Sequence, residues 1–551
     1  MPFQIKGRLI DLDARRTYGA EITVSDDGLI AAITPVDGLM GWDSKAQYIL
    51  PGFIDAHVHI ESSMLLPVEF AKLAVTHGTV ATVSDPHEIA NVLGVPGVEY
   101  MLENARHTPL MIHFGAPSCV PATQGETAGA KLDLKAVEGL LDRPDIHYLS
   151  EVMNYPGVLN GDPELLGMIA AARKRGKPVD GHAPGLLGEQ ATAYASAGIT
   201  TDHECFTEAE ARDKLAAGMK ILIREGSAAK NYAALHALID EFPDQLMFCT
   251  DDSHPDDLMA RHIDYLVSRA LRDGHDLYNV LRIACRNPID HYGLQVGQLR
   301  VGDPADFITV DDPRHMTVTA TYIKGRMVAE AGAHLLPNHK AEVVNKFNCK
   351  PKTPADFVVP AGPAGAQLRV IEVFDGELIT GKKLMEPVLD DAGRPVASPE
   401  HQLYKIAVIN RYHDAPVAVG FCTGFQLGRG AMASSVAHDS HNVVVVGTDD
   451  AMMCTVANAV IEAKGGIAAG RDEHLEILPL PVAGIMTTER GPAVAARYGE
   501  LSGFARRKLR CNLEGPFMTL SFLALLVIPR LKMGDRGLFD GETFAQVGIW
   551  E

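Results

Sequence analysis

The segment Tyr48-Ile-Leu-Pro-Gly-Phe-Ile-Asp-Ala-His57-Val-His59-Ile-Glu61 says more about the fold of this chain than any other stretch. It has the pattern of a short apolar strand that ends in two histidines separated by one residue. Because alternate residues of a strand share a face, His57 and His59 are expected to point the same way. Two imidazoles on one face of a strand end form half of a transition-metal site. Further ligands are therefore expected at the ends of neighbouring strands.

The composition excludes several classes of protein. A chain of 551 residues is too long for one ordinary core and predicts two or three domains, and its 46% hydrophobic and 22% charged residues are typical of globular proteins. The net charge of −20 disfavours nucleic acid and anionic membranes as partners. We see no signal peptide, and the most apolar run, 517–529, is too short to span a bilayer. A cytoplasmic protein is expected.

The cysteines point to no structural role of their own. The eight cysteines are scattered along the chain, and no two of them form a Cys-x-x-Cys pair. This spacing argues against a disulfide framework and against a cysteine-ligated zinc site.

The pattern along the chain predicts an α/β protein built around a (β/α)8 barrel. From residue 51 to 299, apolar strands alternate with helical stretches in about eight βα units, the first strand lying near Ile49–His57. Residues 1–50 and 300–336 have β character, and we expect them to pair in a small β-sandwich beside the barrel. Residues 337–551, which begin with a linker rich in Pro, Lys and Asn, are expected to form a C-terminal α/β domain.

Within the barrel, the expected elements can be placed by residue number. The later strands are predicted at Val80–Ser84, Met111–Phe114, His147–Val152, Pro178–His182, Ile199–His203, Met219–Ile223 and Leu246–Asp251. Helices are predicted at Val68–His77, Pro163–Arg175 and Leu258–Arg272.

The ends of these strands carry an ordered set of metal-ligand side chains. In a (β/α)8 barrel, functional residues lie at the carboxyl ends of the strands. The candidates in chain order are His57, His59, Glu151, His182, His203 and Asp251. Four imidazoles and two carboxylates suffice for two metals bridged by one carboxylate. Alone, each histidine could be a core residue, Glu151 a strand cap and Asp251 a helix N-cap; the joint order favours the metal site.

Several longer motifs resemble those of a known family. The matching stretches are Pro51–Ser63, His77–Thr79, Ser84–Val92, Pro117–Thr123, Ile223–Asn231 and Ala437–Asn442. With the ligand order, they resemble the bacterial adenine deaminases of the amidohydrolase superfamily. The resemblance covers the barrel and the C-terminal region. The cytidine-deaminase type is disfavoured because no Cys-x-x-Cys occurs. The mononuclear type of the superfamily is disfavoured because Gly185 stands where its glutamate follows the strand-five histidine.

The resemblance implies a reaction and a cofactor. His57, His59 and Asp251 would bind one divalent metal, His182 and His203 a second, and Glu151 would bridge them. Mn(II) or Fe(II) is implied, and Zn(II) also suits these donors. A metal-bound hydroxide would attack C6 of adenine, with Asp251 as general base, and yield hypoxanthine and ammonia in purine salvage. A homodimer or higher homo-oligomer is also implied.

Further residues are candidates for binding the substrate. They are Asp85, His87, Glu88, Glu126, Arg224, Ser227, His438, Asp439 and His441. The first three follow strand two and could contact the purine or a further metal, but Asp85 could equally be an N-cap before Pro86. Arg224 could orient substrate or pair with Glu225. The residues from His438 onward could reach the barrel mouth or form a turn at a domain interface.

Two rival functions stay open at this point. An amidohydrolase that acts on another cyclic amide or amidine would use the same metal residues and differ only in its pocket. A non-catalytic metal-binding or scaffold protein would have lost a ligand or the base, yet all six are present.

Overall fold

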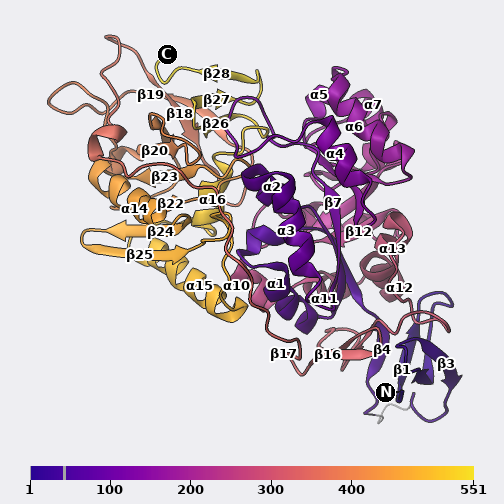
Figure 1. Cartoon of the computed structure of the whole chain (residues 1–551). Helices are drawn as coiled ribbons and strands as arrows, with labels where there is room; N and C mark the ends of the chain where they lie inside the picture. The colour runs from indigo at the N-terminus through magenta and orange to yellow at the C-terminus, as the bar shows by residue number, and fades with distance from the viewer. Residues whose placement is uncertain (1, 41–44) are drawn as a thin grey trace.

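The computed structural model describes residues 2–40 and 45–551 and shows three parts (Figure 1). A (β/α)8 barrel lies in the middle, a β domain adjoins one end of it, and the C-terminal domain covers the other side. The barrel strands are β5 (Phe53–His59), β6 (Thr79–Ser84), β7 (Met111–Ala116), β8 (Ile146–Val152), β9 (Val179–Gly181), β10 (Thr201–Asp202), β11 (Lys220–Arg224) and β12 (Leu246–Cys249).

The barrel closes through two parallel arcs. One arc has the order β13-β5-β6-β7-β8-β9 and the other β10-β11-β12. The two-residue strand β13 (Asp251–Asp252) follows β12 after Thr250 and pairs with the end of β5, so it joins the arcs on one side. On the other side the Thr200 N–H donates to the Val179 carbonyl at 2.8 Å. The carboxyl ends of all eight strands therefore meet at one rim.

The predicted first strand is in fact two strands. Tyr48–Pro51 forms β4 in the flanking β domain, and the barrel strand begins only at Phe53. The chain turns at Gly52, where a Cβ atom would lie 2.3 Å from Val80 Cγ1, so only glycine fits. One apolar run thus serves two sheets, which an apolar pattern alone does not reveal.

The predicted helix Leu258–Arg272 is also divided. It consists of α10 (Pro255–Ala260) and α11 (Ile263–Arg272), with Arg261 extended between them. The break turns His262 inward, where its Nδ1 lies 2.7 Å from Thr79 Oγ1 and its Nε2 3.1 Å from Asp55 Oδ2. The other two expected helices correspond to α1 (Pro67–Ala74), with the 3₁₀ turn η2 (Val75–His77), and α6 (Pro163–Lys174).

The flanking β domain is built from both sides of the barrel segment. Its eight-stranded sheet has the order β17-β16-β15-β14-β4-β1-β2-β3. The strands are β1 (Phe3–Asp11), β2 (Arg16–Val24), β3 (Ile30–Pro35), β4, β14 (Phe307–Val310), β15 (Val318–Ile323), β16 (Arg326–Glu330) and β17 (Ala333–His334). The strands before the barrel and the strands after it meet where β4 pairs antiparallel with β14.

The C-terminal domain contains a mixed eight-stranded sheet of order β19-β18-β21-β20-β23-β22-β24-β25. Its strands are β18 (Leu368–Glu372), β19 (Gly381–Met385), β20 (Tyr404–Ile409), β21 (Ala418–Thr423), β22 (Ala431–Ser434), β23 (Val443–Gly447), β24 (Gly466–Arg471) and β25 (His474–Pro479). The helices are α14 (Asp450–Glu462), α15 (Gly491–Arg507) and α16 (Pro516–Phe522), and β26 (Leu531–Gly534), β27 (Gly537–Asp540) and β28 (Ala545–Val547) form a small antiparallel sheet.

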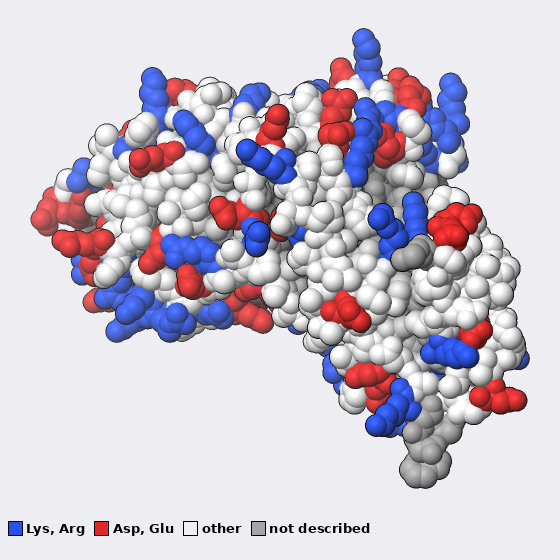
Figure 2. Space-filling view, turned by 60° about the horizontal axis from the view of Figure 1, so that its bottom comes forward, with Lys and Arg blue, Asp and Glu red and all other residues white. Residues whose placement is uncertain are grey.

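The C-terminal domain packs directly on the barrel rim. Asn442 Nδ2 donates to the Thr127 carbonyl at 2.9 Å, and Gln546 Nε2 donates to the Gly125 carbonyl at 3.0 Å. The apolar run 517–529 lies at this interface and is almost entirely buried. Among the described helices, none combines the length and the apolar character that a membrane crossing requires. Acidic and basic side chains are interspersed over the face shown in Figure 2.

Candidate metal centre and substrate pocket

The six expected ligands converge at the barrel rim. His57 and His59 lie at the end of β5, Glu151 is the next-to-last residue of β8, and Asp251 begins β13. His182 and His203 directly follow β9 and β10. All six residues are buried, none being more than 6% exposed. The strand order thus brings together residues that lie up to 194 positions apart in the sequence.

One group of three donors surrounds the end of β5. His57 Nε2 and His59 Nε2 lie 3.1 Å apart, and Asp251 Oδ1 lies 3.4 Å from the first and 3.2 Å from the second. The three ligand atoms lie close enough together to hold one metal ion. Two neutral imidazoles and one carboxylate are donors that Zn(II), Fe(II) and Mn(II) accept.

Glu151 stands between this group and the second one. Its Oε1 lies 3.3 Å from His59 Nε2. Its Oε2 lies 2.8 Å from His182 Nδ1 and 3.1 Å from His203 Nε2. One carboxylate oxygen therefore faces each group of imidazoles, which is the arrangement of a bridging ligand. The chemistry and grouping of these donors fit two divalent metals.

The electrostatics keep both carboxylates ionised. Burial alone would raise the pKa of Glu151, but the imidazoles of His182, His203 and His59 hold it well below its usual range. Burial alone would also raise the pKa of Asp251. The Arg224 guanidinium, with His57 and His59, instead holds this pKa well below its usual range. Both carboxylates are therefore charged at neutral pH.

Glu204 is a site residue that the sequence analysis missed. It directly follows His203, and its Oε1 lies 3.5 Å from His203 Nε2 and 3.7 Å from His182 Nδ1. It is buried and pairs with Arg224. The signal available in the sequence was its position beside a ligand, in Thr201-Asp-His-Glu204.

The residues after strand two fall into separate roles. His87 Nδ1 lies 3.0 Å from Asp85 Oδ2 and 3.4 Å from Glu151 Oε1, so His87 joins the metal centre to the pocket. Asp85 Oδ1 accepts the His87 N–H at 3.0 Å, at the start of α2 (His87–Leu93). Asp85 does not line the pocket and supports His87 instead. Glu88 lines the pocket.

The loop before β23 reaches the barrel, as one of the two expectations had it. His438 Nδ1 contacts Glu88 Oε1, and His441 Nε2 contacts Glu88 Oε2. His438 and Asp439 line the pocket, while His441 lies behind Glu88. Burial raises the pKa of Glu88, but His438, His441 and His87 together hold it well below its usual range. The turn at the domain interface that contains His438 and Asp439 therefore also lines the pocket.

Three other candidates lie outside the pocket lining. Ser227 Oγ donates to Asp257 Oδ2 at 2.6 Å and accepts the His254 N–H, so it fixes the loop after β11. Glu126 is covered by the C-terminal domain, and burial followed by the charge of Asp439 raises its pKa to about 8. The expected pairing of Arg224 with Glu225 does not occur, because Glu225 instead pairs with Arg269 at 2.9 Å.

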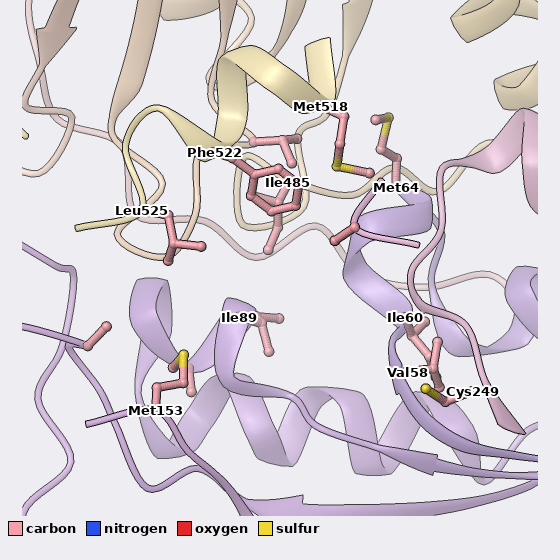
Figure 3. Close-up of a cluster of buried hydrophobic side chains, with 14 of the residues drawn as sticks. Val58, Ile60, Met64, Ile89, Met153, Cys249, Ile485, Met518, Phe522 and Leu525 are labelled. Atoms are coloured by element: carbon pink, nitrogen blue, oxygen red, sulfur yellow. The ribbon is translucent and has the colours of Figure 1, made fainter. Parts of the chain in front are cut away.

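Apolar residues of the C-terminal domain close the pocket over the metal centre. Both domains contribute side chains to this pocket. Its lining includes Leu378, Phe522 and Leu525 opposite Met153 of the barrel. Figure 3 shows Phe522 and Leu525 facing Ile89 and Met153 across the interface. A flat apolar ligand with a polar edge suits a pocket with carboxylates on one side and an aromatic ring on the other.

Comparisons with known proteins agree on one family. A family model described as "Amidohydrolase family" matches residues 48–328, and one described as "Adenine deaminase C-terminal domain" matches residues 377–545. A protein named adenine deaminase from Salinibacter ruber is 55% identical over 98% of both chains. Proteins of the same name from Methanosarcina mazei and Borreliella burgdorferi are 50% and 45% identical, each over 99% of both chains.

Proposed function

The chain belongs to the adenine deaminases of the amidohydrolase family and is a metal-dependent hydrolase that deaminates adenine, and we propose the residues that carry out this reaction. His57, His59 and Asp251 would hold one divalent metal, His182 and His203 would hold a second, and Glu151 would contribute an oxygen to each. Mn(II) or Fe(II) is the proposed metal. The observation that supports this assignment is Glu151, whose two oxygens face two separate groups of donors.

In the proposed reaction, bound metals would activate the water and Asp251 transfers its proton. Two divalent metals bound by these side chains would lower the pKa of a water molecule and make it a nucleophile at neutral pH. Asp251 Oδ1, which faces the His57 and His59 pair, accepts the proton of the attacking water. Asp251 then delivers that proton to the amino group at C6 of adenine, which departs as ammonia, and the second proton of the water ends on N1 of the ring. Adenine and water thus become hypoxanthine and ammonia, a reaction that serves purine salvage.

The pocket wall supplies the selectivity for adenine. The amino group and the imidazole N–H of adenine are hydrogen-bond donors. Oδ2 of Asp439 is buried without a hydrogen-bond partner among the described residues, and Glu88 lines the same pocket while its two oxygens contact His438 and His441. We assign these carboxylates to the donor edge of the purine, and Phe522 to one of its faces.

The rival functions receive less support. Proteins named adenine deaminase match the whole chain, including the C-terminal domain, whereas a different cyclic-amide hydrolase would share only the barrel and its metal residues. A non-catalytic scaffold would not need all six ligand positions, and all six converge here.

The test is ammonia release from free adenine by protein loaded with Mn(II), compared with Asp251→Asn. We expect turnover by the wild type and a loss of kcat of about 1,000-fold or more in the variant, because proton transfer and metal binding both fail. Asparagine adopts the left-handed backbone of residue 251 (φ 56°) about as readily as aspartate, so the fold is retained. Equal rates in the two proteins would refute the assigned base.

A further inference from the structure

Arg224 is a buried cation at the barrel rim that a two-metal site does not itself require. It ends β11 and is fully buried, with 0% of its surface exposed. A buried guanidinium is costly unless its N–H groups and its charge are all compensated. Its partners therefore indicate why it is there.

All three guanidinium nitrogens have partners. Nη1 contacts both Glu204 Oε1 and Asp251 Oδ2, and Nη2 lies 3.1 Å from Glu204 Oε2. Nε donates to the Ala229 carbonyl at 2.7 Å. The planar guanidinium thus binds two carboxylates and the loop that follows the strand at the same time, which a lysine ammonium could not do.

The backbone around Arg224 is fixed as well. Its N–H donates to Asn231 Oδ1 at 2.7 Å, and Asn231 Nδ2 donates to the His203 carbonyl at 3.0 Å. The loop between residues 224 and 231 therefore folds back onto two adjacent strand ends. Arg224 can serve as a rigid support rather than as a mobile surface cation.

Asp251 presents its two oxygens to different surroundings. Oδ1 faces the two histidines at the end of β5, and Oδ2 faces Arg224. We propose that Arg224, together with Glu204, is a positioning residue for Asp251: it holds Oδ2 so that only Oδ1 faces the reacting centre. The same guanidinium keeps Glu204 in its ion pair. The Glu204 carboxylate therefore does not take the place of water beside His182 and His203. The proposal rests on the role of Asp251 as base.

The first test is Arg224→Ala, loaded with Mn(II) and assayed with and without millimolar guanidinium. We expect kcat to fall about 10- to 100-fold, as for other supporting partners of metal ligands, with little change in the KM for adenine. Two metals per chain should remain bound. Guanidinium should restore part of kcat, which it would not do if the residue only stabilised the fold.

The matched control is Arg269→Ala. Arg269 pairs with Glu225, next to Arg224 in the sequence, and contacts none of the six metal residues. Guanidinium should leave its kcat unchanged. Wild-type kcat in folded, metal-loaded Arg224→Ala would overturn the proposal, and so would a loss of kcat that guanidinium does not restore.

A second variant covers the case in which Arg224→Ala does not fold. Glu204→Gln keeps the shape of the side chain but weakens its hold on the guanidinium. We expect a lower kcat at an unchanged KM, and an unchanged kcat would overturn the proposal. Absence of adenine turnover by the wild type would instead count against the proposed function, so the two failures are distinguishable.

Discussion

Glu88 is the residue at which the barrel and the C-terminal domain share one function. It belongs to a helix on the barrel rim, yet its two oxygens contact His438 and His441 of the other domain. It is 1% exposed and lines the pocket. Its charge is therefore held in place by two histidines of the C-terminal domain, at the wall of the pocket.

We predict that Glu88→Gln raises the KM for adenine about 10- to 100-fold, because a hydrogen bond to a charged acceptor contributes about 1.5–3 kcal/mol. Steady-state kinetics with adenine measure the effect. Glu126→Gln is the control, since Glu126 is buried nearby but does not line the pocket. An unchanged KM for Glu88→Gln would remove Glu88 from the substrate site.

The contact between His438 and Glu88 predicts a pH dependence of stability. Burial lowers the pKa of His438, but Glu88 and Asp252 outweigh it and raise that pKa to about 9. A histidine whose folded-state pKa lies above its unfolded value of 6.5 stabilises the protein fully below pH 6.5, and this contribution disappears as the pH rises to 9. The contribution is on the order of 3 kcal/mol.

Unfolding of wild type and His438→Gln between pH 6 and 9.5 measures this effect. The wild type should be the more stable protein at pH 6, and the difference should shrink as the pH rises. Glu88→Gln removes the partner and should weaken the pH dependence. A difference that grows with pH would contradict the ion pair.

The expected metal donors could be placed from the sequence more readily than the side chains that support them. The six ligand types could be placed because every barrel strand ends at the same rim. The partners of Arg224 could not, because the register of β11 beside β10 decides which neighbour its side chain reaches. Sequence proximity suggested Glu225, whereas the structure selects Glu204 and Asp251.

Among the elements, α16 links the core of the C-terminal domain to the pocket. Phe522, its last residue, lines the cavity and packs against the His438 ring with centroids 5.0 Å apart. Phe517, one turn earlier, instead packs against Tyr498. Lys532 Nζ donates to the Leu378 and Phe522 carbonyls, at 2.6 and 3.1 Å, so it ties together two segments that line the pocket. The helix thus has one end in the site and the other in the core.

We predict that Phe522→Ala raises the KM for adenine about tenfold, because base–aromatic stacking contributes about 1–3 kcal/mol. Phe517→Ala is the matched control, with the same residue change in the same helix. It should lower the Tm and leave the KM unchanged. Equal effects of both variants on KM would mean that the helix acts only through stability.

Element boundaries marked the limit of what the sequence could predict. Most barrel strands were foreseen from apolar runs with turns between them. The divided segments Tyr48–His59 and Leu258–Arg272 were not, since each break is caused by a tertiary contact: Gly52 packs against Val80, and His262 bonds to Thr79. A local sequence pattern does not reveal such tertiary contacts.

At the scale of the whole molecule, the proposed metal centre lies where strand ends from both arcs of the barrel meet. Its six ligands come from five strand ends, and only Glu151 and Asp251 supply negative charge among the six. Cations bound there would tie the two arcs of the barrel to each other. Stability should therefore depend on metal occupancy.

We predict that Mn(II) added to chelator-treated protein raises Tm by about 5 °C or more, because a ligand at 100 times its Kd adds about 2.7 kcal/mol per site. Differential scanning calorimetry measures the shift. His203→Ala lacks one ligand and should show a smaller shift, while Arg269→Ala should show the full one. An identical Tm with and without Mn(II) would contradict the metal centre.

The shared sheet of the flanking β domain has a consequence for synthesis on the ribosome. β4 finds its partner β14 only after residue 307 has been made, more than 250 residues later. At bacterial or eukaryotic elongation rates, this delay is on the order of 10–50 s. During that interval β4 can already pair with β1, but its other edge has no partner strand, and chaperones that bind nascent chains are expected to occupy that edge.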